Sequence, residues 1–333
     1  MSIPRVFVSR RIPKAGLDEL QHACELEVWP GDLPPPTAVL REKARDADGL
    51  LVLLTDAVDA ELLQGASRLR VVSNFAVGYN NIDLAEATRR GVRVGNTPGV
   101  LTDATADAAV ALLLAAARRI AEGDRYSRAG CWKTWEPVGH IGADLVGATL
   151  GVVGMGRIGF AVAKRLHLAW NMRILFLNRN DNSTTAAAER ELGAERATFD
   201  RLLQESDFIS VHSGLNDESR GLFDAAAFGK MKPTAVFVNT ARGGIVVEDD
   251  LCDALERGAI FAAGIDVTDP EPPPAGSRLF RMENLVVAPH LASATTLTRN
   301  RMAKMAAENL LAAFAGRPMP SCVNLEALKE AGR

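Results

Sequence analysis

Short apolar runs alternate with amphipathic stretches along most of this chain. In the first hundred residues the apolar runs predict strands at residues 5–9, 25–29, 49–54, 70–74 and 93–95. The stretches between them repeat apolar residues at helical spacing, which predicts helices at residues 14–22, 37–47, 60–66 and 83–90. Strands that alternate with helices are typical of a parallel sheet covered on both faces.

A second series of the same kind follows the segment Asn96-Thr97-Pro98-Gly99, which cannot continue a strand or a helix. It predicts a helix over residues 102–119 and strands at residues 149–153, 173–177, 208–211, 235–239, 262–266 and 285–288. This is about the number of strands in a complete dinucleotide-binding sheet. A last long helix, residues 293–314, ends at Gly316 with Pro318 beyond it.

The alternation predicts an α/β protein with two doubly wound parallel-sheet domains. A Rossmann dinucleotide-binding domain would comprise residues 101–291. A flavodoxin-like substrate-binding (catalytic) domain would comprise residues 1–100 and 292–333, because the last helix follows a sheet that is already complete. We expect the functional site in the cleft between the two domains.

Composition and charge narrow the function classes. The 333 residues are 47% hydrophobic and 24% charged, as in ordinary soluble proteins, and a net charge of -3 gives no reason to expect a nucleic-acid partner. The local arginine cluster of residues 118, 119, 125 and 128 is interpreted as a solvated helix end. The most apolar run, residues 108–117, is too short to span a membrane, which needs about 20 residues.

The cysteines are scattered and form no CxxC motif or zinc-like pairing with the histidines; they are Cys24, Cys131, Cys252 and Cys322. We expect free thiols in a reducing compartment and no metal site. The first residues lack the pattern of a secretory signal. These features predict a cytoplasmic enzyme.

The stretch TLGVVGMGRIGFAVAKRL, residues 149–166, passes from an apolar strand through three glycines into a helix. Gly154 would form a tight turn, Gly156 would let the backbone approach a pyrophosphate, and Gly159 would let the helix pack closely on the strand. The first N–H groups of the helix would bind the pyrophosphate. A GxGxxG motif also occurs in ordinary turns, but its place between a strand and a helix predicts a dinucleotide site.

The residue expected on the adenosine ribose lies about 20 residues past the glycines, at the end of the second strand. This position is Asn178, and Arg179 follows it. A carboxylate there would bind a ribose 2′-hydroxyl and repel a 2′-phosphate, whereas Asn178 and Arg179 can accept the phosphate. The sequence favours NADP(H). NAD(H) stays open, because Asp181 is near and Arg179 has an alternative interpretation as a solvated turn residue.

Three motifs stand at the ends of successive predicted strands, at residues 239–244, 269–272 and 288–293. The carboxyl ends of strands in a doubly wound sheet face one crevice, so Arg242, Glu271 and His290 can meet there. His290 can move a proton near neutral pH, Glu271 can stabilise the imidazolium, and Arg242 can bind a substrate carboxylate. Each residue alone has a structural explanation, but together they predict a catalytic site beside the nucleotide.

In this combination the sequence resembles the D-isomer-specific 2-hydroxyacid dehydrogenases, and within them most the glyoxylate/hydroxypyruvate reductases. The resemblance covers nearly the whole chain. It is carried by the GxGxxG stretch and by NFAVGYNNID (74–83), NTPGVLTDATAD (96–107), NTARGG (239–244), AAGIDV (262–267) and PHLASAT (289–295). The subgroup rests on CWKTWEP (131–137), TLTRNRM (296–302) and GRPMP (316–320).

The resemblance implies a role for each matching residue. Arg242 would bind the carboxylate and carbonyl oxygen of the substrate, His290 would donate the proton in reduction, and Glu271 would tune His290. The backbone N–H groups of Val77 and Gly78 would bind the carboxylate. Trp135 would reach the active site of the partner in a homodimer, with a packed loop aromatic as the alternative. Cofactor contacts would come from Thr105, Gly154, Gly156, Arg157, Ile158, Gly159, Asn178, Arg179, Asn180, Gly214, Thr240, Ala241, Arg242, Asp266, His290 and Ala292.

Two positions depart from the family's pattern. The family often has a proline two residues after the histidine of its fourth-strand motif, where this chain has Gly214, which implies a differently shaped adenine-side pocket. The usual aspartate of the loop after Gly78 is Asn80, which the sequence does not explain. The remaining histidines match no catalytic position: His22, His140, His167 and His212.

We therefore predict a reductase that passes a hydride from NADPH to the carbonyl carbon of a small 2-oxo acid, glyoxylate or hydroxypyruvate. One alternative is another D-2-hydroxyacid dehydrogenase that uses NADH. Of these, phosphoglycerate enzymes often carry a further regulatory domain that is not expected here, and a formate dehydrogenase would be expected to replace Glu271. The other alternative is a non-catalytic NAD(P)-sensing binding module, which the lack of a polar interaction tail disfavours.

Overall fold

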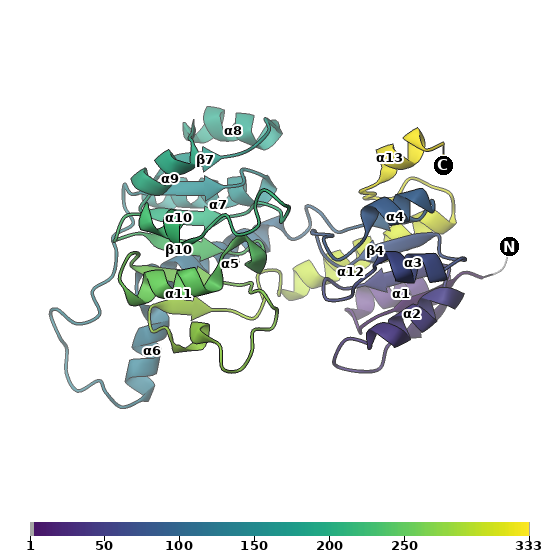
Figure 1. Ribbon diagram of the computed structural model, residues 1–333, viewed down its shortest axis with the longest axis horizontal. Coiled ribbons are helices and arrows are strands. Elements are labelled where there is room, and N and C mark those ends of the chain that lie inside the picture. Colours follow the sequence, from purple (N-terminus) through teal and green to yellow (C-terminus); the bar gives the residue numbers. More distant parts are fainter. Residues whose placement is uncertain (1–2, 333) are drawn as a thin grey trace. The chain divides into compact units, whose positions relative to one another are not determined.

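The computed structural model describes residues 3–332, which divide into two compact units. Unit 1 comprises the chain up to Leu101 together with the residues from Ala294 onward, and unit 2 comprises Thr102–Ser293. Each unit has one parallel sheet with helices on both faces (Figure 1). The predicted fold class, α/β with two parallel sheets, is confirmed.

The sheet of unit 1 has the strand order β2-β1-β3-β4-β5, which is the order of flavodoxin-like sheets. Its strands are β1 (Arg5–Val8), β2 (Glu25–Val28), β3 (Gly49–Val52), β4 (Val71–Asn74) and β5 (Arg93–Gly95). Its helices are α1 (Lys14–Gln21), α2 (Thr37–Asp46), α3 (Ala60–Gly65), α4 (Leu84–Arg89), α12 (Thr296–Phe314) and α13 (Leu325–Glu330).

Helix α12 packs directly on α1 in unit 1. A Cβ atom on Gly16 of α1 would lie 2.5 Å from the carbonyl oxygen of Ala303 in α12, so glycine lets these helices approach closely. The central strands β3 and β4 are buried along their whole length. The last long helix of the chain thus completes the core that the first hundred residues begin.

The sheet of unit 2 has the strand order β12-β11-β10-β9-β6-β7-β8, so the order reverses between β6 and β9. Its strands are β6 (Thr149–Val153), β7 (Arg173–Leu177), β8 (Glu195–Arg196), β9 (Phe208–Val211), β10 (Val236–Asn239), β11 (Ala262–Ile265) and β12 (Leu285–Val287). Its helices are α5 (Thr102–Ala117), α6 (Ile120–Arg128), α7 (Arg157–Trp170), α8 (Ser183–Leu192), α9 (Phe199–Glu205), α10 (Ala225–Gly229) and α11 (Glu248–Glu256). Such a reversal marks the ligand crevice of a dinucleotide-binding sheet.

The core of unit 2 lies on both faces of its sheet. On β10, Phe237 packs into one buried cluster while Val236 and Val238 pack into the other, because successive side chains of a strand point to opposite faces. The cluster around Phe237 includes the rings of Phe223 and Phe228, with centroids 4.8 Å and 5.5 Å from that of Phe237. This packing fixes the carboxyl ends of the strands, where the candidate site lies.

The structure corrects several predicted elements. The helix predicted over residues 102–119 ends at Ala117, because Arg119 adopts a left-handed φ of 53° and α6 begins at Ile120. The last long helix begins at Thr296 instead of residue 293, since the side chain of Thr295 caps it by accepting a hydrogen bond from Thr298 N. The short elements β8 and α13 were not predicted.

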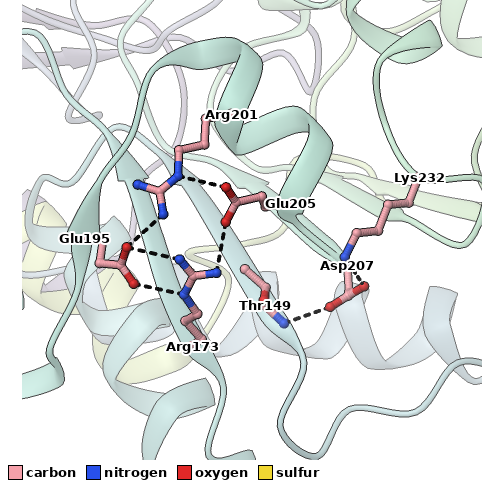
Figure 2. Close-up of polar contacts among 7 residues, drawn as sticks. All are labelled: Thr149, Arg173, Glu195, Arg201, Glu205, Asp207 and Lys232. Atoms are coloured by element: carbon pink, nitrogen blue, oxygen red, sulfur yellow. Dashed lines mark hydrogen bonds and ion pairs between the residues drawn. The ribbon is translucent and has the colours of Figure 1, made fainter.

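Charged residues join the amino ends of several strands of unit 2 (Figure 2). Arg173, the first residue of β7, pairs with Glu195 of β8 and Glu205 of α9, each at 2.9 Å. Arg201 of α9 pairs with the same two carboxylates at 2.8 Å, which closes a ring of four charges. We call these four residues the charge ring. It lies at the edge of the sheet opposite the carboxyl ends of the strands.

No helix within residues 3–332 is long and apolar enough to cross a membrane. All four cysteines are free thiols, of which Cys24 and Cys252 are buried and Cys131 is exposed. In the same part of the chain, no group of three or more His, Cys, Asp or Glu side chains is arranged to hold a metal ion.

Candidate active site

The glycine motif forms the turn between β6 and α7. Gly154 has a φ of 97°, and a Cβ on it would lie 2.6 Å from Ser213 N, so only glycine fits this turn. A Cβ on Gly159 would lie 2.3 Å from the carbonyl oxygen of Gly154, which explains the close packing of helix and strand. Gly156 caps α7 without a side-chain hydrogen bond, and space around it is open. The uncapped N–H groups that begin at Arg157 fit the pyrophosphate of a dinucleotide.

The segment after β7 is organised by Asn178. Its Oδ1 accepts a hydrogen bond from Met155 N at 3.0 Å, and its Nδ2 donates one to the carbonyl oxygen of Asn180 at 2.5 Å. The side chain of Asn178 therefore ties the glycine turn to the residues after β7. Arg179 is exposed and pairs with Glu218 at 2.8 Å. The position expected on the ribose carries no carboxylate, which suits a 2′-phosphate.

Arg242 lies in a loop that begins at the end of β10. Asn239 holds this loop: its Oδ1 accepts a hydrogen bond from Ala241 N, and its Nδ2 donates one to the carbonyl oxygen of Arg242, both at 2.9 Å. A Cβ on Gly243 would lie 2.0 Å from the carbonyl carbon of Thr268. Glycine at position 243 therefore brings the Arg242 loop against the loop after β11, which carries Glu271.

His290 and Glu271 are in direct contact. His290 Nδ1 lies 2.5 Å from Glu271 Oε1, and both side chains are partly buried. His290 adopts a left-handed φ of 51°, an uncommon conformation for a residue other than glycine. Asp266 holds this conformation, because its carbonyl oxygen accepts from His290 N at 2.9 Å and its carboxylate accepts from Leu291 N and Ala292 N at 2.7 Å and 2.9 Å.

The surroundings shift the ionisation of three groups at these strand ends. Burial lowers the pKa of Arg242, and the nearby carboxylate of Glu271 opposes this change. Burial raises the pKa of Asp266, although its hydrogen bonds to Leu291 N and Ala292 N act in the opposite direction. Burial lowers the pKa of His212 to about 3, so this histidine is neutral. The carboxylate of Glu271 thus acts on Arg242 and also contacts His290.

His212 links the ends of β9 and β10. Its Nε2 lies 2.8 Å from Ser210 Oγ, and its Nδ1 lies 3.4 Å from Thr240 Oγ1. It therefore has a structural role, and it supports Thr240 at the end of β10.

The loop after β4 in unit 1 presents two amide groups. The carbonyl oxygen of Val77 accepts a hydrogen bond from Asn96 Nδ2 at 2.7 Å, and that of Gly78 accepts one from Asn74 Nδ2 at 2.8 Å. Within the described residues, the N–H groups of Val77 and Gly78 have no hydrogen-bond acceptor. With both carbonyls held by asparagines, these N–H groups are available to an anion such as a carboxylate.

The remaining predicted positions are spread over unit 2. Four strands of unit 2 are followed by predicted cofactor residues, near the groups described above. Strand β9 is followed by Gly214, β10 by Thr240 and Ala241, β11 by Asp266, and β12 by Ala292. Thr105 is buried in α5. Trp135 is 80% exposed in the long loop that follows α6 and projects from unit 2 (Figure 1). The structure does not bring Trp135 to His290 in this chain.

Sequence reasoning missed three asparagines that hold these loops: Asn74, Asn96 and Asn239. Each stands at or just after the carboxyl end of a strand. An asparagine there is also an ordinary turn residue. One sequence feature could have identified them: an asparagine recurs at or just after the end of three predicted strands, in NFAVG, NTPGV and NTARGG.

Known proteins are similar to this chain over most of its length. Residues 110–292 match the family described as "D-isomer specific 2-hydroxyacid dehydrogenase, NAD binding domain". A glyoxylate reductase of Korarchaeum cryptofilum is 49% identical over 98% of this chain and 97% of its own length. The TT0316 protein of Thermus thermophilus superposes with a TM-score of 0.88 at 45% identity, over 96% of this chain and 99% of that one.

A further solved structure was determined with a bound cofactor. It is an NADPH-dependent glyoxylate/hydroxypyruvate reductase of Sinorhizobium meliloti in complex with NADP and malonate. Its TM-score is 0.84 at 30% identity, and the match covers 97% of each chain. The present chain belongs to the D-isomer specific 2-hydroxyacid dehydrogenase family and is an NAD(P)-dependent 2-hydroxyacid dehydrogenase.

Proposed function

We propose that this dehydrogenase is an NADPH-dependent reductase of a small 2-oxo acid, glyoxylate or hydroxypyruvate. From hydroxypyruvate it would form the D-2-hydroxy acid. The observation that carries the proposal is the 2.5 Å contact between His290 and Glu271, which follow two strands of the sheet that also carries the glycine turn. The names of the similar reductases of Korarchaeum cryptofilum and Sinorhizobium meliloti support the choice of substrate.

His290 would supply the proton. Because its Nδ1 faces the carboxylate of Glu271, Nδ1 carries a hydrogen and Nε2 is left to hold the transferable proton. Nε2 would give that proton to the carbonyl oxygen of the substrate, which becomes the hydroxyl of the product. Glu271 stabilises the protonated imidazole before transfer and keeps the ring oriented.

The carboxylate of the substrate would be held by Arg242 and by the free N–H groups of Val77 and Gly78. A guanidinium binds a carboxylate through two parallel hydrogen bonds, which fixes the direction of the adjacent carbonyl. With the carbonyl oxygen aimed at His290 Nε2, one face of the carbonyl carbon is left for reduction. Alignment of this kind supplies much of the rate enhancement in such reactions.

The cofactor, when bound, supplies the hydride. The residues that we propose to hold it are those predicted from the resemblance, with the turn of Gly154, Gly156 and Gly159 and the start of α7 at the pyrophosphate. Asn178, Arg179 and Asn180 would lie at the adenosine ribose. NADPH is preferred in this proposal because no carboxylate occupies position 178.

Replacement of His290 tests the assignment. His290→Ala should lower kcat with a 2-oxo acid by about 10²–10⁴-fold, because the general acid is removed, while the Kd for NADPH stays near the wild-type value. His22→Ala is the matched control, since His22 is exposed in unit 1, and it should leave kcat unchanged. Near-normal turnover of His290→Ala would overturn the proposed role.

We also propose that the protein forms a homodimer through α6 and the loop that follows it. This helix buries none of its residues. Apolar side chains of the segment are exposed, namely Ile120, Trp132, Trp135, Val138 and Ile141. Such a surface suits a second copy of the chain. In that dimer Trp135 would contribute to the partner's substrate site.

We also propose that the protein is located in the cytoplasm. Four free thiols suit a reducing compartment. A net charge of -3 gives no reason to expect a nucleic-acid partner, and we expect no membrane partner.

A further inference from the structure

We propose that Arg196 is a specificity-determining residue for the cofactor. Together with Arg179 it would bind the 2′-phosphate of NADPH, and Asp181 and Glu218 would hold the two arginines when no phosphate is bound. This inference rests on the proposed preference for NADPH.

Arg196 lies at the place where the ribose is expected. It is on β8, directly opposite Phe176 of β7, and its guanidinium carbon is 5.3 Å from the centroid of the Phe176 ring. Its Nη1 donates a hydrogen bond to the carbonyl oxygen of Asn178 at 2.8 Å. Its Nη2 pairs with Asp181. The guanidinium is thus fixed beside Asn178 by a ring, a carbonyl and a carboxylate.

Asn178 cannot bind the phosphate well by itself, because its side chain is already bonded to Met155 N and to the carbonyl oxygen of Asn180. Arg179 is exposed and held by Glu218 at 2.8 Å. Two arginines therefore flank the segment after β7, and each is paired with one carboxylate. Without a bound phosphate, the positive charges of the two arginines are balanced by these carboxylates. The site can therefore also accept NADH, which has no 2′-phosphate.

The pair of Arg196 with Asp181 can be exchanged for a phosphate. The side chain of Asp181 is 90% exposed, and exposed ion pairs are weak because water and salt screen them. A phosphate offers a larger charge and accepts two parallel hydrogen bonds from a guanidinium. Since the ring of Phe176 and the carbonyl of Asn178 would still hold Arg196, little ordering would be needed. Asp181 then competes with the phosphate.

Binding measurements by titration calorimetry test this proposal without turnover. The probes are NADPH, NADH, and adenosine 2′,5′-bisphosphate, which carries the 2′-phosphate and lacks the nicotinamide. Arg196→Gln should raise the Kd for NADPH and for the bisphosphate by about tenfold or more, with little change for NADH. Arg196→Lys should restore part of the loss. Asp181→Asn should tighten both phosphate-bearing ligands.

Arg190→Gln is the matched control, because Arg190 is an exposed arginine of the neighbouring α8 that pairs with Glu191. It should leave every Kd unchanged. An equal loss of NADPH and NADH affinity in Arg196→Gln, or no loss at all, would overturn the inference. Weaker NADH binding by Asp181→Asn would also overturn it, because Asp181 would then be a ribose ligand.

Turnover separates this inference from the proposed reductase. If the wild type reduces a 2-oxo acid with NADH and discriminates against NADPH, the inference and the proposed preference for NADPH both fail, whereas the proposed reduction of a 2-oxo acid stands. If the affinities follow the pattern above and no 2-oxo acid is reduced, the reductase fails and the role of Arg196 stands.

Discussion

Asparagines at strand ends orient the groups that we assign to substrate binding. Asn96 and Asn74 each hold one carbonyl oxygen, of Val77 and Gly78 respectively, and so leave the N–H groups of both residues free. Asn239 holds the loop of Arg242 by two hydrogen bonds. None of these amides needs to touch the substrate. Their effect is to fix the direction of backbone donors before a ligand arrives.

Loss of the Asn96 amide should therefore weaken substrate binding. In Asn96→Ala the carbonyl of Val77 loses its 2.7 Å hydrogen bond, and the loop is freer to turn its N–H groups away. We expect KM for the 2-oxo acid to rise roughly 3- to 10-fold, the effect of a hydrogen bond of about 1 kcal/mol. The Kd for NADPH should not change.

Asn324→Ala is the matched control for this experiment. Asn324 is a buried asparagine of unit 1 that bonds to Val94 N and to the carbonyl oxygen of Val92, so its loss should also lower stability. Its KM should stay near the wild-type value. An equal rise of KM in both variants would show that the effect of Asn96 is only a loss of stability.

At this scale the sequence suggests candidate chemical groups, and the structure adds the contacts that hold them. Arg242, Glu271 and His290 could be chosen because their types have complementary chemistry and each follows a strand. The role of Asp266 in holding the His290 backbone could not be predicted from the sequence, because it depends on the fold of residues 290–292. The contacts of Asn178 could not be predicted either, because its side chain ties the glycine turn to the segment after β7 through bonds that only the folded loops define.

Among the strands, β8 is the one that sequence patterns could not find. It has two residues, Glu195 and Arg196, and both are polar and exposed. A strand of this kind shows no apolar run, and it forms because β7 offers a free edge. This strand nevertheless carries two important residues. Glu195 belongs to the charge ring, and Arg196 is the residue that we propose to bind the 2′-phosphate of the cofactor.

The charge ring makes stability depend on pH. Hydrogen bonds from Arg173 and Arg201 lower the pKa of Glu195 from 4.5 to about 2 (Figure 2). A carboxylate with a lowered pKa in the folded state stabilises the protein fully above its unfolded value of 4.5, and this contribution is lost as pH falls toward about 2. The free energy of unfolding of the wild type should therefore exceed that of Glu195→Gln at neutral pH, and this difference should shrink below pH 4.5.

Urea unfolding over a series of pH values measures this difference. Glu189→Gln is the matched control, because Glu189 is an exposed glutamate of α8 that forms no ion pair within residues 3–332. Its difference from the wild type should not vary with pH in the same window. Salt at about 1 M should reduce the effect of Glu195→Gln, since its partners are exposed. A difference that is independent of pH would contradict this account of the ring.

For the whole molecule, the alternation of apolar runs and amphipathic stretches was enough to predict two parallel sheets. The buried strands β3 and β11 are continuous apolar runs, so their positions could be read closely. The break between α5 and α6 could not be predicted, because residues 108–122 on both sides of it are mostly good helix formers and the left-handed Arg119 sets the break. The exposed segment after α6 is likewise visible only in the structure.

This exposed segment yields a prediction about assembly. We expect sedimentation velocity to give the mass of a dimer for the wild type. The double variant Trp135→Ser, Val138→Ser should be monomeric at the same concentration, because both side chains are 80% exposed in the single chain and would be buried between copies. Leu168→Ser, at an exposed position of α7, is the control and should remain dimeric. A monomeric wild type would refute the proposed dimer.

The central claim is that the protein reduces a small 2-oxo acid with NADPH. The most direct measurement follows the near-ultraviolet absorbance of NADPH and of NADH with glyoxylate, hydroxypyruvate and pyruvate in turn, using the purified wild-type protein. We predict oxidation of NADPH in equal amount to the hydroxy acid formed, fastest with glyoxylate or hydroxypyruvate. Absence of cofactor oxidation with every 2-oxo acid, while NADPH still binds, would contradict the claim and indicate a non-catalytic nucleotide-binding protein.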